Sequence, residues 1–270
     1  MKKFTLFLFF LSSTVTLANE KKICQNLDLP NDPKTGACFQ PDPHKELVIV
    51  FAAHPDDETI GFSGQIAQAV RKNKQVIVEM MTDGEGSGAQ GVLKSEGYGL
   101  TDSEFGQARL REFQAAMIRL NVSGIHWNRI QSTHLKPEDI ENRIQFWKQH
   151  RSRHKALNAE LFGVASDKND FSFNIDHSAV FNGLLASQVK NKKWFLVYEY
   201  RDPSRGLNHF RSMLNKEDCA RSRLAKNEYR VFAPLQKRYA IGWTYSTPGL
   251  FQNAYQDCAE FIVGEDQLIR

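Results

Sequence analysis

The sequence has few cysteines, no internal repeat and no low-complexity tract. Its four cysteines include no Cys-x-x-Cys pair, so a cysteine-based zinc site is not expected. The charges are nearly balanced, with 35 Lys and Arg against 31 Asp and Glu and a formal net charge of +4, and they are spread along the chain. A nucleic-acid surface would need clustered basic charge. One short basic run, residues 148–155, fits the solvated end of a helix better, and we expect no nucleic-acid partner.

Beyond the N-terminus the sequence also has no long apolar run. Lys2 and Lys3 precede a short apolar stretch at residues 4–11, and small and polar residues follow up to Ala18. This order is typical of a cleaved signal peptide, and the stretch is short for a membrane-spanning helix, which needs about 20 residues. We therefore expect residues 1–18 to be a signal peptide, with no stable transmembrane segment after its cleavage. The protein would be exported to a periplasm, to the extracellular space or, in a eukaryote, to a secretory lumen.

An exported protein meets an oxidising environment, in which an even number of cysteines indicates disulfides. Four cysteines allow three pairings, and proximity in the sequence favours Cys24–Cys38 and Cys219–Cys258. The first bond would tie down an irregular, polar lead-in at residues 19–45.

The remaining residues, 46–270, fit one domain in which strands and helices alternate. Residues 47–52 are a continuous apolar run, which is typical of a strand buried on both faces of a parallel sheet. Further strands are predicted at residues 75–81, 124–127, 161–165 and 194–200, and helices at residues 60–70, 105–120 and 137–147 and after His177. The alternation predicts an α/β fold, Rossmann-like and three-layered, with a mainly parallel sheet. Residues beyond 205 are interpreted as a C-terminal extension of mixed helix and strand.

Polar residues follow the first two predicted strands directly. His54, Asp56 and Asp57 come after the first strand, and Asp83 and Glu85 come after the second. Ligands of open α/β sheets bind outside the carboxyl ends of the strands. We therefore expect these two segments to meet at one rim of the sheet.

The residue types after the first strand suit a zinc ion. Imidazole and carboxylate are zinc ligands, and a catalytic zinc usually keeps three protein ligands and one open position. His54 and Asp57 are two predicted ligands, and His177, at the start of a predicted helix, is the best candidate for the third. Asp56 would then be free to act on a zinc-bound water. Asp176 either orients a metal-bound histidine or caps the helix.

Several motifs together resemble the PIG-L/LmbE family of N-acetyl-sugar deacetylases. The first and most specific is Ala-His-Pro-Asp-Asp-Glu at residues 53–58, which follows a hydrophobic strand. The similarity covers residues 46–200. It continues through Gly61 and Gly64, Thr-Asp-Gly-Glu at residues 82–85, Arg109 and Glu112, Asn-Ile-Asp-His at residues 174–177 and Tyr-Glu-Tyr at residues 198–200.

The resemblance implies a zinc-dependent hydrolase that removes an N-acetyl group from an N-acetylglucosamine-type sugar or glycoconjugate. It implies that His54, Asp57 and His177 bind zinc, which would polarise the amide carbonyl. Asp56 would be the general base and would then pass its proton to the leaving amine. Arg109 would lie near the sugar.

One position departs from the family pattern. The second family motif is often His-x-Asp-His, and its first histidine, assigned to oxyanion stabilisation, is Asn174 here. Asparagine can donate a hydrogen bond but cannot carry charge or transfer a proton. We expect Asn174 to serve beside Asp176, or His126, His134 or His209 to substitute for it. The alternatives are a metal-dependent esterase or phosphoesterase, and a weakly active or inactive carbohydrate-binding relative.

Some of these residues also fit structural roles. Asp83 and Glu85 are either substrate contacts or turn residues. Arg109 and Glu112 are either part of the site or an ion pair on a helix surface. The glycine pattern at residues 86–91 fits a dinucleotide-binding motif, but the residues after it do not form an apolar helix, so a mobile loop at the site is favoured.

Overall fold

The computed structural model describes residues 29–151, 159–165, 174–195, 209–246 and 258–263. Within them a seven-stranded sheet runs in the order β3-β2-β1-β4-β5-β9-β6. The strands are β1 (Leu47–Ala52), β2 (Gln75–Thr82), β3 (Gly124–Ile130), β4 (Ala159–Val164), β5 (Lys192–Phe195), β6 (His209–Met213) and β9 (Ala259–Val263). Strands β1 to β5 are mutually parallel. At the edge beyond β5, strand β9 pairs antiparallel with β5, and β6 pairs antiparallel with β9. The predicted α/β fold with a mainly parallel sheet is confirmed.

Strands β1 and β2 are buried on both faces, which the continuous apolar run of residues 47–52 predicted for β1. Every residue of β1 and of β2 is buried. Strand β1 lies between β2 and β4, so that Leu47 pairs with Gln75 on one side and with Ala159 on the other. A parallel strand in this position needs helices on both sides.

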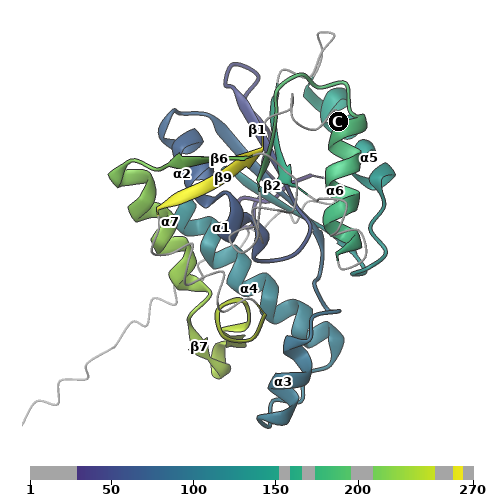
Figure 1. The fold of residues 1–270 in the computed structure, drawn as a ribbon, viewed down its shortest axis with the longest axis vertical. Helices are drawn as coiled ribbons and strands as arrows, with labels where there is room; N and C mark the ends of the chain where they lie inside the picture. The colour runs from purple at the N-terminus through teal and green to yellow at the C-terminus, as the bar shows by residue number, and fades with distance from the viewer. Residues whose placement is uncertain (1–28, 152–158, 166–173, 196–208, 247–257, 264–270) are drawn as a thin grey trace, which may run out of the picture.

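Helices cover both faces of the sheet, which gives the predicted three layers (Figure 1). One hydrophobic core joins the sheet to α1, α2, α4 and α7, and a second joins it to α5 and α6. Alternate residues of β1 face the two cores, with Val48 and Val50 in the first and Ile49 and Phe51 in the second. The helices are α1 (Asp57–Gly61), α2 (Ser63–Arg71), α3 (Ala89–Ser95), α4 (Asp102–Leu120), α5 (Pro137–Arg151), α6 (Ile175–Ala186) and α7 (Lys216–Glu228).

Local capping explains where two helices begin. Helix α4 starts three residues before the predicted boundary because Thr101 and Glu104 form a capping box, each side chain bonding to the other's backbone N–H. Helix α6 begins at Ile175, so it includes His177 rather than following it. The cap of α6 is Asn174, whose side chain accepts a hydrogen bond from the backbone N–H of His177.

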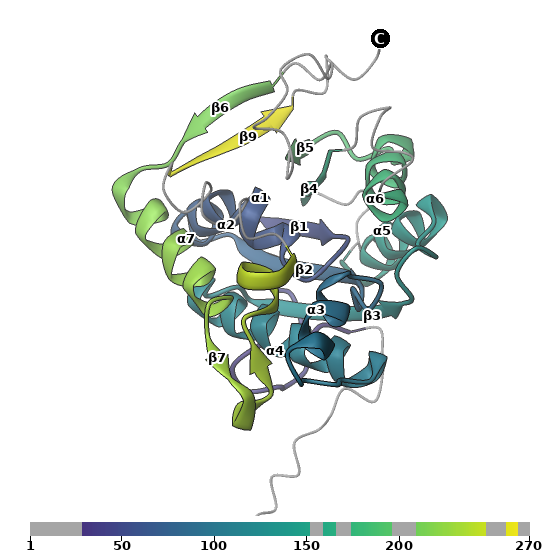
Figure 2. The ribbon, with the colours of Figure 1, turned by 60° about the horizontal axis from the view of Figure 1, so that its bottom comes forward.

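The described C-terminal residues pack against the sheet and the helices that precede them. Helix α7 contributes Ala225 to the first core, together with Tyr229 just beyond its end. A short hairpin of β7 (Phe232–Ala233) and β8 (Arg238–Tyr239), connected by η4 (Pro234–Gln236), leads into η5 (Ile241–Ser246). Figure 2 shows this segment beside α3 and α4, where Tyr239 and Ile241 pack in a small third core.

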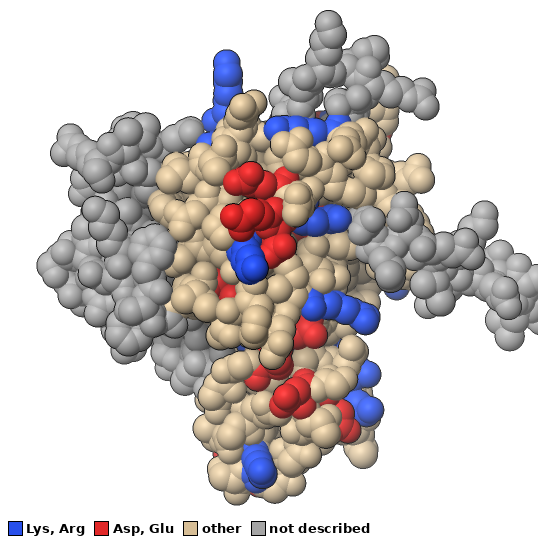
Figure 3. All heavy atoms as spheres, turned by 90° about the vertical axis from the view of Figure 1, so that its right-hand side faces the viewer, with Lys and Arg blue, Asp and Glu red and all other residues tan. Residues whose placement is uncertain are grey.

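The surface on the α5 and α6 side carries mixed charge. Figure 3 shows Lys and Arg side chains as separate groups among Asp and Glu on this face, over the part of the chain that the structure describes. The second half of the basic run at residues 148–155 falls outside the described residues, so the absence of a nucleic-acid partner stays a prediction. None of the described helices is long and apolar enough to span a membrane.

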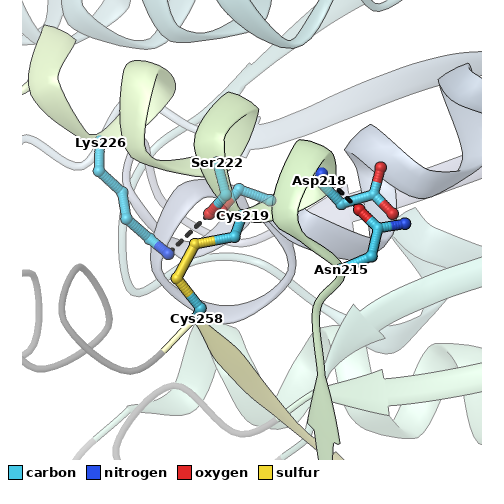
Figure 4. The surroundings of a disulfide bond; sticks show 7 residues. Asn215, Asp218, Cys219, Ser222, Lys226 and Cys258 are labelled. Carbon is cyan, nitrogen blue, oxygen red and sulfur yellow. Dashed lines mark hydrogen bonds between the residues drawn. A yellow bond between two sulfur atoms is a disulfide. The ribbon is translucent and has the colours of Figure 1, made fainter.

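One of the two expected disulfides is present, and it joins α7 to β9 (Figure 4). Cys219 and Cys258 are bonded, with their Cα atoms 5.2 Å apart, so this predicted pairing is confirmed. The other expected pair involves Cys24, which lies outside the described residues. The expected signal peptide and the tyrosine-containing motif at residues 198–200 lie outside them as well.

Candidate metal and catalytic site

The segments that follow β1 and β2 meet at the carboxyl ends of these strands, as predicted. Thr82, the last residue of β2, donates hydrogen bonds from its backbone N–H and its hydroxyl to the carbonyl oxygen of Ala53, at 3.0 and 2.7 Å. This double contact fixes the end of β2 against the residue that precedes His54. The N-terminal end of α6 approaches from the other side of β1 and brings Asp176 and His177 to the same place.

Three of the predicted residues form a cluster with the geometry of a metal site. His54, Asp57 and His177 each offer one ligand atom, and these atoms lie within 4.8 Å of one another. Oδ1 of Asp57 is 3.1 Å from Nε2 of His177, and Oδ2 of Asp57 is 3.6 Å from Nδ1 of His54. Asp57 and His177 are buried, whereas the His54 side chain keeps 17% of its surface exposed. Two imidazoles and one carboxylate are a donor set that suits zinc.

Asp176 holds His54 from the side opposite Asp57. Its Oδ2 lies 3.0 Å from Nε2 of His54 and accepts a hydrogen bond from the backbone N–H of Thr133 at 2.8 Å. Its Oδ1 accepts from the backbone N–H of Leu135. With Nε2 engaged by Asp176, the Nδ1 atom of His54 is turned toward Asp57. A carboxylate behind a histidine in this way fixes the ring orientation and the tautomer.

The electrostatics of the cluster favour positive charge between its carboxylates. Burial lowers the pKa of His54, but its hydrogen bonds with Asp176 and Asp57 outweigh this effect and raise the pKa to about 9. Burial acts to raise the pKa of Asp57, yet the charges and hydrogen bonds of His177 and His54 hold it well below its usual range. Asp176 also has a lowered pKa because its bond to His54 and its backbone donors outweigh burial. Two carboxylates and the raised pKa of His54 therefore mark this place as one that favours a positive charge.

Asp56 lies outside the three-residue cluster and is held by Arg109 of α4. Nη2 of Arg109 donates to Oδ2 of Asp56 at 2.9 Å and to the carbonyl oxygen of Pro55. Its Nη1 donates to the carbonyl oxygen of Gly84 at 2.9 Å. Gly84 has a φ of +65°, and a Cβ at this position would collide with the guanidinium. Burial raises the pKa of Asp56, and the charge of Arg109 opposes that rise.

The burial of Arg109 and Glu112 rules out the helix-surface interpretation of this pair. Their exposed fractions are 2% and 0%. Glu112 accepts hydrogen bonds from the backbone N–H groups of Tyr239, Ile241 and Gly242, at 3.3, 2.9 and 3.3 Å. It therefore anchors the segment after α7 to α4. Contact between Arg109 and a sugar stays a prediction, because in this structure its guanidinium binds the loops around Asp56.

Asp83 and Glu85 tie the loop after β2 to the end of β3. The Asp83 carboxylate accepts a hydrogen bond from the indole N–H of Trp127. Glu85 accepts from the backbone N–H and the hydroxyl of Ser132, at 2.9 and 3.2 Å. Both side chains are partly exposed at the rim, so their contacts account for a structural role and leave substrate binding as a prediction.

Asn174 has a defined structural role as the helix cap already described, and its side-chain nitrogen remains the group that could donate to a substrate. Among its suggested substitutes, His126 is buried, with Nδ1 2.9 Å from Oε2 of Glu79. Glu79 also bonds to Arg143 and Trp147 of α5, so His126 lies on the face of the sheet that α5 covers. His134 is exposed, with Nδ1 3.2 Å from the carbonyl oxygen of Ser132. His209 lies in β6, at the far edge of the sheet from β1.

Two contributors to the site were missed from the sequence. The loop at residues 131–135 supplies backbone N–H groups to Asp176, and Tyr229, just beyond α7, donates a hydrogen bond to Glu58 at 2.8 Å. A backbone donor carries no residue-type signal. Tyr229 lies 171 positions from Glu58, and no motif in the chain links the two.

Comparison with known families gives one match by sequence. A family model described as PIG-L, GlcNAc-PI de-N-acetylase, matches residues 49–186, about half of the chain. That range contains the His54, Asp57 and His177 cluster, Asp56 and Arg109. It ends before α7 and the C-terminal strands. A sequence search of curated proteins gives no match.

Solved structures with the same fold include deacetylases and one enzyme of another class. N,N'-diacetylchitobiose deacetylase from Pyrococcus horikoshii is 15% identical with a TM-score of 0.51, over 81% of this chain and 83% of that one. A deacetylase of the teicoplanin biosynthetic pathway is 16% identical with a TM-score of 0.54, over 80% and 96%. The 4-carboxy-2-hydroxymuconate hydratase of Pseudomonas putida is 15% identical with a TM-score of 0.53, over 77% and 82%. At such identities the likeness shows the fold, and the hydratase illustrates that one fold hosts different reactions.

Proposed function

The chain belongs to the PIG-L family, and from this premise we propose that it is a zinc-dependent hydrolase that removes an N-acetyl group from an amino sugar or glycoconjugate. The observation that carries the proposal is the division of the site into two parts. Three side chains converge as a metal-binding cluster, while the neighbouring carboxylate of Asp56 stays outside it and is held by Arg109. Hydrolysis of an amide needs both a group that stabilises the developing oxyanion and a base that activates water.

His54, Asp57 and His177 would hold the metal. The three-residue set with an open position is that of catalytic zinc sites, and zinc when bound supplies Lewis acidity toward an amide carbonyl and a more acidic water. Asp176 would keep the His54 ring in its ligating orientation through the contact at Nε2.

Asp56 would accept a proton from the attacking water and return it to the nitrogen of the leaving amine. The amide bond breaks in the second of these steps, and the acetyl group leaves as acetate. Arg109 would fix the direction of the Asp56 carboxylate and favour its ionised form, since its charge opposes the rise in pKa that burial causes. A carboxylate that serves first as base and then as acid is consistent with Asp56, which lies beside the metal ligands and outside their cluster.

An amino-sugar substrate is supported by the family and by the fold. The description of the family model names a de-N-acetylase of an N-acetylglucosamine conjugate. Solved structures of this fold include a diacetylchitobiose deacetylase. Export from the cytoplasm is supported by the Cys219–Cys258 disulfide, because such bonds persist in oxidising compartments.

The role of Asn174 favours a second candidate, a carbohydrate-binding relative with little or no turnover. Its side-chain oxygen is engaged as the cap of α6, and its amide cannot transfer a proton. This candidate predicts that the protein binds amino sugars without releasing acetate.

A release screen tests the proposal. Zinc-loaded protein is incubated with N-acetylglucosamine, chitooligosaccharides, cell-wall fragments and glycolipid head groups, and free amine and acetate are measured. The Asp56→Asn variant serves as the matched control because it keeps the size of the side chain and removes the base. Equal amounts of amine and acetate from wild-type protein alone would support the deacetylase. Phosphate release from phosphoester substrates would point to a phosphoesterase, and sugar binding without acetate would point to the second candidate.

A further inference from the structure

Glu58 and Tyr229 form a buried connection between the candidate site and the C-terminal part of the chain. The Tyr229 hydroxyl donates to Oε1 of Glu58 at 2.8 Å, and the backbone N–H of Asp56 donates to Oε2 of the same carboxylate at 3.2 Å. Glu58 and Tyr229 both have an exposed fraction of 0%. One carboxylate therefore links a tyrosine beyond α7 to the backbone of Asp56.

Asp56 needs such support because its backbone is strained. Its φ is 152° and its ψ is −28°, a combination that residues with a Cβ rarely adopt. Strained backbone persists only where the surroundings determine it more than once. Arg109 binds the Asp56 side chain and the carbonyl of Pro55, and Glu58 binds the Asp56 N–H. Side chain and backbone are thus held by separate partners.

Tyr229 directly follows α7, and this helix is held by contacts that do not involve the site. Along α7, the Ser222 hydroxyl lies 2.7 Å from that of Ser63 in α2, and Asp218 pairs with Arg71 at 2.9 Å. The disulfide joins α7 to β9, as Figure 4 shows beside Asp218 and Ser222. Helix α7 is therefore held through Ser222, Asp218 and Cys219, and Tyr229 at its end contacts Glu58.

A neighbouring group with nucleophile-like chemistry does not compete with this interpretation. Nζ of Lys226 lies 2.8 Å from the Ser222 hydroxyl, the distance expected of a lysine–serine catalytic pair, although here the lysine is the donor. Ser222, Lys226 and Ser63 are exposed by 1%, 1% and 0%, so a substrate cannot reach them. The group ties α7 to α2.

We propose that Glu58 and Tyr229 are positioning residues for Asp56, so that α7, beyond the residues matched by the family model, is part of the catalytic apparatus. The proposal rests on the function proposed above, in which Asp56 is the general base. Without the Glu58 contact the Asp56 backbone would relax toward an ordinary conformation, and its carboxylate would turn away from the attacking water. The metal ligands His54 and Asp57 have their own partners and would stay in place.

The kinetic test uses Tyr229→Phe and Glu58→Gln. Each change should lower kcat by about tenfold, the factor that corresponds to one lost hydrogen bond, and leave KM within about twofold. Bound zinc per chain should not change. The double variant should be no slower than the slower single variant, because both changes interrupt one connection. Tyr239→Phe, which removes a hydroxyl from a buried ring packed on Tyr98, is the matched control and should keep wild-type kcat.

A second readout does not depend on turnover. The amide hydrogen of Asp56 should exchange about tenfold faster in Glu58→Gln than in wild-type protein, while amides in β1 stay unchanged. Unchanged exchange or unchanged kcat in both single variants would overturn the proposal, as would a loss of zinc that parallels the loss of kcat. If wild-type protein releases no acetate, the proposed function fails on its own, and the exchange comparison still decides whether Glu58 holds Asp56.

Discussion

Arg109 and Asp56 form a buried ion pair, with Nη2 of Arg109 2.9 Å from Oδ2 of Asp56 and both side chains at most 5% exposed. The same guanidinium bonds to the carbonyl oxygens of Pro55 and Gly84. It therefore joins α4 to the loops that follow β1 and β2. We expect an arginine in this position to orient the proposed base, and its predicted contact with the sugar stays a prediction.

The Arg109→Lys variant tests that role. Lysine keeps the charge but cannot reach three acceptors in the fixed geometry of a guanidinium. We expect kcat to fall by at least about tenfold, or roughly 1.4 kcal/mol, with zinc content unchanged. The control is Arg119→Lys in the same helix, because the Arg119 side chain is 55% exposed and pairs with Glu228 of α7 rather than with the site. An equal loss of kcat in both variants would show a general effect on α4 and would contradict a specific role of Arg109.

Metal content separates the ligands from the base. His177→Ala removes a predicted ligand and should leave well under about one zinc per chain, whereas Asp56→Asn should keep about one zinc and lose turnover. His150→Ala, an exposed histidine of α5 stacked on Phe146, is the control and should change neither. The measurement is zinc per chain by atomic emission after dialysis. Full retention of zinc in His177→Ala would place the third ligand elsewhere.

Glu112 should make stability depend on pH in the neutral range. Burial raises its pKa to about 7, despite its three backbone donors. A raised pKa means that the folded state holds the proton more tightly than the unfolded state. The stability gained from this is complete below pH 4.5 and is lost as the pH rises through 7.

The change that isolates this effect is Glu112→Gln. The unfolding free energy of this variant, measured relative to wild type at the same pH, should rise by up to about 3 kcal/mol as the pH is raised from about 4.5 to about 8. Urea unfolding across this range measures the difference. Glu138→Gln, at an exposed position of α5, should run parallel to wild type. A constant difference between wild type and Glu112→Gln would contradict the buried-carboxylate explanation.

The Cys219–Cys258 disulfide should contribute substantially to stability. It closes a loop with a sequence separation of 39, for which the chain-entropy model gives about 4 kcal/mol. The double variant Cys219→Ser/Cys258→Ser should lose about this amount of unfolding free energy in urea. Comparing wild-type and double-variant protein with and without reductant separates this bond from any other. A double variant as stable as the oxidised wild type would refute the prediction.

The sequence was most informative where one local rule determined the outcome. The apolar run in β1 predicted a strand buried on both faces, and the alternation of strands and helices predicted a parallel sheet. Since the carboxyl ends of neighbouring parallel strands lie at one rim, the convergence of the segments after β1 and β2 also followed. The start of α4 was predicted three residues late, although the Thr101 and Glu104 capping box is present in the sequence.

The C-terminal part could not be predicted in the same way. Strands β6 and β9 pair over a long sequence separation and with antiparallel register, and neither has the long apolar run of β1. Helix α7 has a buried face that includes the charged side chains Asp218 and Lys226. Charged residues in a buried face obscure the helical pattern on which a sequence prediction depends.

By itself the sequence determined the fold class and the rim at which polar residues gather, because periodicity and strand direction are local properties. The proximity of His177 to His54 and Asp57 was an expectation from the resemblance to the PIG-L/LmbE motifs, since His177 and Asp57 lie 120 positions apart. Only the tertiary structure decided that Arg109 faces Asp56, that Asp176 stands behind His54, and that Tyr229 reaches Glu58. Each of these contacts joins elements far apart in the chain, and the packing of the core sets their distances.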